Sequence, residues 1–177
     1  VMTGFGRTGK WFALEHWDVK PDIMTMAKGL TSAYAPLGAV AMKEKIAARF
    51  DHEAYQGGLT FNGHPVSMAA AIANIEVIRE NKLVENSTAM GAQLADILAE
   101  LKSRHASIGD VRSIGLFGGI ELVRNRETRE PMAPFNEKSA EMSKLREQLL
   151  EKGLFLYTHW NILLIVPPLI INEQELN

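Results

Sequence analysis

Residues 20–30 read Lys20-Pro-Asp-Ile-Met-Thr-Met-Ala-Lys-Gly-Leu30. A Pro-Asp turn precedes a short apolar run, and this pattern predicts a strand over 23–26. Lys28 follows the run almost directly, and its next neighbour is a glycine. A lysine held rigidly at a strand end, beside a glycine that lets a flat ring approach, is what Schiff-base chemistry requires. Lys28 is therefore a candidate catalytic residue, and the alternative is a solvated lysine that closes a strand.

Further motifs flank Lys28, and several motifs in a fixed order are far more specific than any single one. The five motifs are Met2-Thr-Gly-Phe-Gly-Arg-Thr-Gly9, Pro21-Asp-Ile23, Met26-Ala-Lys-Gly-Leu30, Pro36-Leu-Gly38 and Gly58-Leu-Thr-Phe-Asn-Gly-His-Pro65. In this order they resemble the class III (omega, or ornithine-type) aminotransferases, which are fold-type I enzymes that depend on pyridoxal phosphate. The resemblance runs from Val1 to the last residue and is nearest to the omega-amino acid–pyruvate transaminases.

The resemblance implies an α/β fold made of two parts. Residues 1–82 would form the C-terminal part of the cofactor-binding large domain, and residues 83–177 an α+β small domain that is truncated at its end. Relatives carry Asp-Glu immediately before the position of Val1, and that aspartate pairs with the ring nitrogen of the cofactor. The spacing of Asn172 and Glu175 predicts a capping box at the start of a last helix. We therefore expect a piece of a longer parent, which would not transaminate on its own.

Apolar patterning predicts the elements of both parts. The runs at 23–26 and 37–42, bounded by Pro and Gly, are typical of buried strands in a mostly parallel sheet. A short helix over 43–50 and a loop over 51–63 lead to a helix that begins at Pro65. The residues of that helix that should face the core are Met68, Ala69, Ile72, Ile75 and Ile78. In the small domain we expect helices over 83–104 and 137–152, and strands over 108–114, 116–123, 154–158 and 162–166.

Three residues are candidate cofactor-binding residues on the resemblance. It implies that Lys28 holds the cofactor aldehyde as an internal aldimine and, once freed, moves a proton between the substrate carbon and the cofactor. It implies that the Thr60 hydroxyl binds the cofactor phosphate of the neighbouring subunit, in a homodimer or a dimer of dimers. The alternative for Thr60 is a turn threonine that bonds its own backbone. Val1 would pack against one face of the pyridine ring, unless it is a frayed terminal residue.

The substrate is predicted partly from missing arginines. Some relatives bind a substrate carboxylate with an arginine where this chain has Leu164, and others where it has Tyr157. Tyr157 and Trp160 offer an aromatic, hydrogen-bonding wall instead, while Arg112 forms either a strand-side salt bridge or a carboxylate contact. We therefore expect a donor whose reacting carbon is remote from its acid group, such as β-alanine or taurine, and a 2-oxo acid acceptor, pyruvate. An ornithine-, acetylornithine- or GABA-type aminotransferase, an aminomutase and a decarboxylase stay open.

Composition argues against several other classes of protein. The net charge is −2 without a basic stripe, so we expect no nucleic-acid partner. The strongest apolar run, 162–171, is interrupted by Pro167-Pro168 and is too short to span a bilayer. The absence of cysteine excludes disulfides and thiolate metal sites and fits a reducing compartment, so we expect a cytoplasmic protein. The histidines show no metal-ligand spacing, and we expect no metal.

One motif is misleading. Gly4-Phe-Gly-Arg-Thr-Gly9 matches the dinucleotide fingerprint G-x-G-x-x-G letter for letter. That fingerprint requires a strand before it and a crossover helix after it. Residues 10–17 are too few and too aromatic for such a helix, and Lys20-Pro21 would stop it. We therefore interpret the motif as a structural loop.

Overall fold

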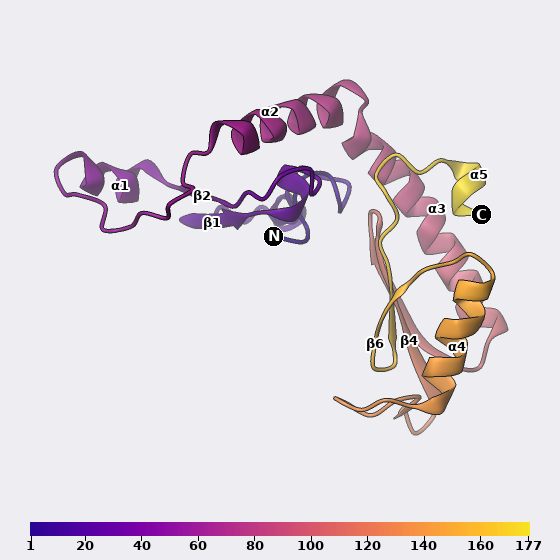
Figure 1. Cartoon of the computed structure of the whole chain (residues 1–177). Coiled ribbons are helices and arrows are strands. Elements are labelled where there is room, and N and C mark those ends of the chain that lie inside the picture. Colours follow the sequence, from indigo (N-terminus) through magenta and orange to yellow (C-terminus); the bar gives the residue numbers. More distant parts are fainter. The chain divides into compact units, whose positions relative to one another are not determined.

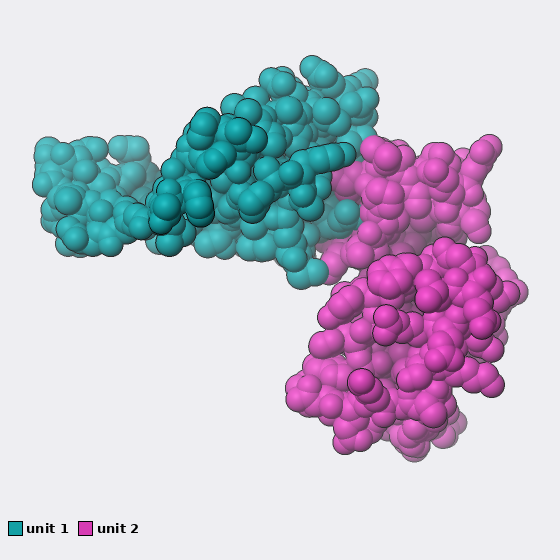
Figure 2. Space-filling model, viewed as in Figure 1, with its two compact units in different colours: residues 1–85 teal, residues 86–177 magenta.

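The computed structural model describes all residues, 1–177, and they fold as two compact units (Figure 2). The first unit comprises Val1–Glu85 and the second Asn86–Asn177. Helix α3, Leu83–Arg104, begins at the end of the first unit and lies mostly in the second (Figure 1). No helix is long and apolar enough to cross a membrane.

The first unit contains one pair of strands, β1 (Ile23–Met26) and β2 (Ala39–Met42). The pair is antiparallel, so the expectation of a mostly parallel sheet is wrong for these two strands. None of their residues is buried within this chain. The segment between the strands contains only the one-turn helix η2 instead of a crossover helix, so the chain doubles back beside β1. The other elements are η1 (Ala13–Trp17), η2 (Lys28–Leu30), α1 (Glu44–Ala47), η3 (Ala48–Asp51) and α2 (Pro65–Glu80).

Helix α2 begins at Pro65 as predicted, but it turns a different face inward. Its buried residues are Ser67, Ala71 and Ile78, whereas Met68 and Ile72 of the predicted stripe are exposed. Small inward side chains let the helix backbone approach the η2 turn, which the helix contacts. Counting apolar residues alone therefore selected the wrong face over the first two turns of α2.

The second unit is built on an antiparallel sheet of five strands in the order β3-β4-β7-β6, with β5 paired to β4. The β3–β4 hairpin was predicted almost to the residue. Its turn contains Gly115 with a φ of 54°, and α3 approaches this turn so closely that a Cβ on Gly91 would lie 2.5 Å from the Gly115 Cα. The strands are β3 (Ile108–Ile114), β4 (Phe117–Asn125), β5 (Glu130–Pro131), β6 (Tyr157–His159) and β7 (Ile162–Ile165), and the remaining helices are α4 (Ala140–Glu151) and α5 (Glu173–Leu176).

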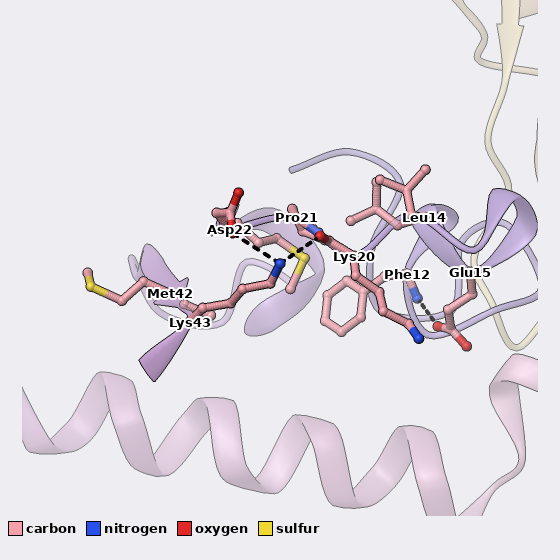
Figure 3. Close-up of a pocket in the computed structure, with 11 residues that line it drawn as sticks. Phe12, Leu14, Glu15, Lys20, Pro21, Asp22, Met42 and Lys43 are labelled. Atoms are coloured by element: carbon pink, nitrogen blue, oxygen red, sulfur yellow. Dashed lines mark hydrogen bonds and ion pairs between the residues drawn. The ribbon is translucent and has the colours of Figure 1, made fainter. Parts of the chain in front are cut away.

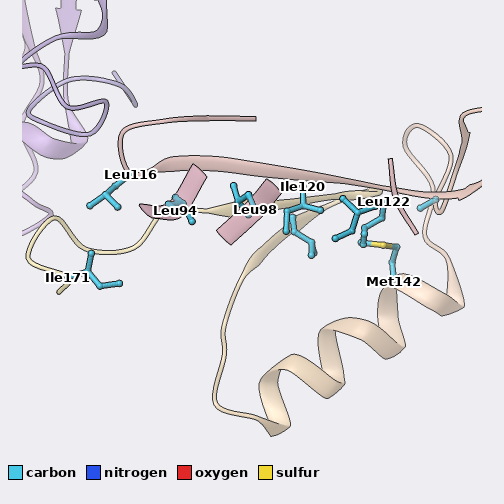
Figure 4. Close-up of a cluster of buried hydrophobic side chains, with 10 residues drawn as sticks. Leu94, Leu98, Leu116, Ile120, Leu122, Met142 and Ile171 are labelled. Carbon is cyan, nitrogen blue, oxygen red and sulfur yellow. The ribbon is translucent and has the colours of Figure 1, made fainter. Parts of the chain in front are cut away.

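The core of the second unit lies between one face of this sheet and the helices (Figure 4). Leu94 and Leu98 of α3 are buried there, as the apolar stripe of that helix predicted. They meet Ile120 and Leu122 of β4 and Met142 of α4 in one cluster. Because successive residues of a strand point to opposite faces, the other face of the sheet carries Gly119 and Glu121.

The largest boundary differences in the second unit are at the starts of α4 and β6, whereas the start of α5 agrees with the prediction. Helix α4 begins only after Ser139, because the Ser139 hydroxyl caps it by accepting a hydrogen bond from the Met142 amide at 3.2 Å. Strand β6 begins at Tyr157, several residues later than predicted. The capping box of Asn172 and Glu175 at the start of α5 is confirmed.

Candidate functional site

Lys28 lies at the turn that follows β1. It begins η2 with a φ of 48°, in the left-handed region that non-glycine residues seldom adopt. Its side chain is exposed and its ammonium takes part in none of the ion pairs of the first unit. The structure therefore presents Lys28 as an accessible amine on a constrained backbone.

Gly29 packs closely against Phe5 beneath this turn. A Cβ on Gly29 would lie 3.0 Å from the Cβ of Phe5, a buried side chain. Phe5 belongs to the glycine-rich loop 4–9, which is followed by the five-residue helix η1 and not by a crossover helix. The loop thus lacks the context of a dinucleotide site, and it supports the backbone next to Lys28.

Asn74 of α2 also holds this turn, and sequence reasoning missed it. Its amide Nδ2 donates to the carbonyl oxygens of Gly29 at 2.8 Å and Leu30 at 3.2 Å. A second tie is local, since the Thr31 hydroxyl donates to the Ala35 carbonyl at 2.7 Å. The only sequence signal was a polar residue among the alanines and isoleucines of an otherwise apolar helix.

Thr60 lies in the exposed loop between η3 and α2. Leu59 and Phe61 on either side are 79% and 78% exposed, and a Cβ on Gly58 would meet nothing within 4 Å. The Thr60 hydroxyl forms no hydrogen bond within the chain, so the structure differs from the alternative in which Thr60 bonds its own backbone. The loop offers an accessible hydroxyl with open backbone beside it.

Val1 is 52% exposed and borders a cavity of about 260 Å³ beside β1. A neighbouring cavity of about 360 Å³ lies between η1, β1 and β2 (Figure 3). Asp22 and Lys43 line it, and the Asp22 carboxylate forms ion pairs with Lys43 at 3.0 Å and with Lys45 at 2.8 Å. Hydrogen bonds from Lys45 and Lys43 hold the pKa of Asp22 below its ordinary value. Neither Lys28 nor Thr60 lines this second cavity.

In the second unit, strand register brings three singled-out positions into one row. Arg112 lies opposite Gly119, Gly119 opposite Leu164, and Leu164 opposite Tyr157. Directly paired residues of neighbouring strands point to the same face of a sheet. Arg112, Leu164 and Tyr157 therefore share the face that α3 does not cover.

Arg112 is already engaged by carboxylates on that face. Its Nε donates to Asp110 at 2.7 Å, and its Nη2 lies 3.5 Å from Glu121. The hydrogen bond to Asp110 raises the pKa of Arg112, while Lys102 first and Arg112 second lower the pKa of Asp110 to about 2. The structure shows the strand-side salt bridge. A substrate carboxylate would therefore have to compete with the carboxylates of Asp110 and Glu121 for Arg112.

The rings of Tyr157 and Trp160 are connected through the ring of His159. The Tyr157 ring stacks on His159 at 6.1 Å, whereas the Trp160 ring packs 3.9 Å from His159 and 4.2 Å from Phe135. Trp160 also borders a cavity of about 380 Å³ with the first half of α4. The aromatic residues are neighbours along the hairpin, with His159 between them. No group of three His, Asp or Glu side chains is placed to hold a metal ion.

The sequence model of the family described as aminotransferase class-III matches residues 1–177. The chain belongs to the class III aminotransferases. This confirms the resemblance that the ordered motifs indicated, and with it the α/β fold of a pyridoxal phosphate-dependent transferase. Here the fold is seen as a mixed structure with antiparallel sheets.

Several aminotransferases are similar over most of the chain. The taurine–pyruvate aminotransferase of Bilophila wadsworthia is 48% identical over 139 residues, which cover 75% of the chain and 30% of that protein. The putrescine–pyruvate aminotransferase of Pseudomonas aeruginosa is 35% identical over 178 residues, covering 100% of the chain and 38% of that protein. The taurine:2-oxoglutarate aminotransferase of Bifidobacterium kashiwanohense, solved with pyridoxal phosphate and glutamate, superposes with a TM-score of 0.95 at 38% identity. That match covers 99% of the chain and 40% of the solved one, so the chain spans well under half of these relatives.

Proposed function

We propose that the whole protein is a pyridoxal phosphate-dependent transaminase that moves an amino group from an omega-amino acid or amine to a 2-oxo acid. Lys28 is the residue that carries the cofactor. The observation behind this proposal is the exposed Lys28 amine on a left-handed turn, next to a glycine that Phe5 packs against. Membership of the class III family supplies the chemistry that such an amine serves.

The residues present fit the cofactor in their chemistry. An accessible primary amine on a fixed backbone suits attachment of an aldehyde. The Thr60 hydroxyl, beside open glycine backbone, suits a phosphate, and the apolar Val1 suits the face of a ring. When bound, pyridoxal phosphate supplies an electron sink for the carbanion that forms at the substrate carbon.

In this proposal Lys28 has two tasks. Its Nζ attaches the cofactor between turnovers. During turnover the same Nζ takes the proton from the substrate carbon that bears the amine and delivers it to the C4′ carbon of the cofactor. Both tasks need an amine that is aimed reproducibly, because misplaced reacting groups lose much of the rate. The constrained turn after β1 provides that aim.

Donors without an α-carboxylate are favoured over donors that carry one. Two relatives are named for taurine and one for putrescine, compounds without an α-carboxylate. In this chain Leu164 and Tyr157 are not arginines, and Arg112 in the same row is bound to Asp110 and Glu121. We propose pyruvate as the acceptor, which two of the relatives use, while the solved relative is named for 2-oxoglutarate.

We further propose that Thr60 acts across the interface of a homodimer. Its loop exposes Tyr55, Leu59 and Phe61, and exposed apolar clusters of this kind mark interaction surfaces. Thr60→Ala should weaken cofactor binding in the full-length protein, because hydrogen bonds to charged groups are worth about 1.5–3 kcal/mol. Equilibrium titration with pyridoxal phosphate measures this, and an unchanged affinity would contradict the assignment.

Covalent mapping tests the central proposal. The full-length protein loaded with pyridoxal phosphate is reduced with borohydride, digested and analysed by mass spectrometry. We expect the label on Lys28, and Lys43 and Lys45 serve as internal controls because they bind Asp22 nearby. Label on any other lysine would show that the proposal is wrong.

A further inference from the structure

One side chain from another element completes the turn that carries Lys28. We propose that Asn74 of α2 is a positioning residue for Lys28, because its amide fixes the left-handed turn that aims the amine. The inference rests on the proposed function of Lys28 and deepens it. Asn74 does not touch the reacting atoms; it acts through the backbone of residues 28–30.

The hydrogen bonds around Lys28 account for four consecutive carbonyl groups. The Ala27 carbonyl accepts from the Leu30 amide at 3.1 Å, and the Lys28 carbonyl accepts from the Thr31 amide at 3.2 Å. The next two carbonyls, of Gly29 and Leu30, both accept from the Asn74 amide. Carbonyls at a packed turn need partners, and the turn itself supplies only the first pair. Asn74 supplies the rest from a helix 45 residues away in sequence.

Backbone strain at Lys28 explains why external ties are needed. A side chain at a φ of 48° is unfavourable, and such conformations persist only where the surroundings over-determine them. Phe5 restricts the turn by its volume beneath Gly29. Asn74 adds two direction-dependent bonds. Without them the turn keeps only its two backbone hydrogen bonds and the Phe5 contact, and the aim of the Lys28 amine would be less well fixed.

The position of Asn74 in α2 supports the same conclusion. Asparagine is a poor helix former, and the inward face of a helix normally carries apolar residues. Asn74 is half-buried and lies one turn from the buried Ala71 and Ile78. The contact with the Lys28 turn accounts for a polar residue at this place.

The test compares the removal of two side-chain amides in the full-length protein, one within α2 and one at its C-terminal cap, with pyridoxal phosphate as the probe. Asn74→Asp keeps the shape of the side chain but removes both N–H donors. We expect covalent attachment at Lys28, trapped with borohydride and quantified on the Lys28 peptide, to slow by roughly tenfold or more. Backbone amides of 27–31 should exchange hydrogen faster. Asn81→Asp is the control, because the Asn81 amide donates only to Val77 within α2 at 3.0 Å, and both readouts should stay unchanged.

A failure of the Asn74 inference and a failure of the proposed function of Lys28 give different results. Asn74→Ala removes the same donors without adding a charge, and we expect it to slow attachment as Asn74→Asp does. A wild-type rate with unchanged exchange in Asn74→Asp would overturn the inference, as would a loss of protection spread over all of α2 and β1 in both Asn74 variants. If the wild-type label lies on another lysine, the proposed function fails instead, and the exchange data still report whether Asn74 holds the turn.

Discussion

The backbone conformation of Trp160 could not be predicted from the sequence pattern. It occupies the first of the two positions between the paired residues His159 and Ile162, with a φ of 53°, whereas Asn161 has no positive φ. Turns of this kind normally carry glycine at the first position. The His-Trp-Asn run gave no such signal for the turn, and the apolar residues 154–156 led to a predicted start of β6 before Tyr157.

Two substitutions at Trp160 separate backbone strain from ring packing. Trp160→Gly and Trp160→Ala both remove the ring that packs on Phe135. Only alanine keeps a Cβ in the left-handed region, which costs about 1–2 kcal/mol. We expect the glycine variant to have the higher free energy of unfolding by about that amount, measured by chemical denaturation. Equal stabilities would show that the turn does not hold this conformation in solution.

Asp110 predicts a pH dependence of stability. Its folded pKa of about 2 lies below its ordinary value of 3.8, because Lys102 and then Arg112 bind the charged carboxylate. A lowered carboxyl pKa stabilises the fold fully above the ordinary value, and this contribution is lost as the pH falls through about 2. The side chain is 38% exposed, so solvent screening limits the effect to about 1 kcal/mol or less. Asp110→Asn should remove this acid-side slope from denaturation curves; an unaltered slope would assign it to other carboxylates.

At the scale of elements, local signals were sufficient where one periodicity dominates. The limits of α3 and β3 and the start of α2 at Pro65 match their predictions. Helix α3 carries a long apolar stripe, β3 is a bounded apolar run, and α2 begins at a proline. The inward face of α2 was missed because a polar contact, from Asn74 to the Lys28 turn, helps to set the rotation of that helix. A contact between residues far apart in sequence leaves no periodic trace.

The approach of α3 to the β3–β4 turn gives a second stability prediction. Alanine is normally better than glycine in a helix by about 1 kcal/mol. At Gly91, however, a Cβ would lie 2.5 Å from the Gly115 Cα, and backbone atoms cannot move aside cheaply. We expect Gly91→Ala to destabilise the protein by about 1–3 kcal/mol, as overpacking does. The neighbouring, exposed Ala92 is the control, since Ala92→Gly should show the ordinary propensity cost; a stabilising Gly91→Ala would contradict the close contact.

For the whole molecule, the family was predictable from the order of five motifs, and the family model confirms it over the full chain. The substrate was not predictable to the same degree. The proposed role of Lys28 rests on one local turn, whereas donor preference depends on every group that surrounds the substrate. The chain covers 30–40% of the length of the three relatives described above. Its residues therefore supply only part of the groups around the substrate.

The donor preference is nevertheless testable through one row of the sheet. An arginine binds an α-carboxylate through paired, charge-assisted hydrogen bonds. The row from Arg112 through Gly119 and Leu164 to Tyr157 contains no other arginine, and Arg112 is already paired with Asp110. We expect the full-length protein to have a higher kcat/KM for taurine, β-alanine or putrescine than for ornithine or acetylornithine, with pyruvate as acceptor. Leu164→Arg should shift this ratio toward the α-carboxylate donors, whereas Leu164→Met, which adds no charge, should leave it unchanged. A wild-type preference for ornithine would mean that another part of the protein clamps the carboxylate, and it would overturn the omega-donor assignment without touching the role of Lys28.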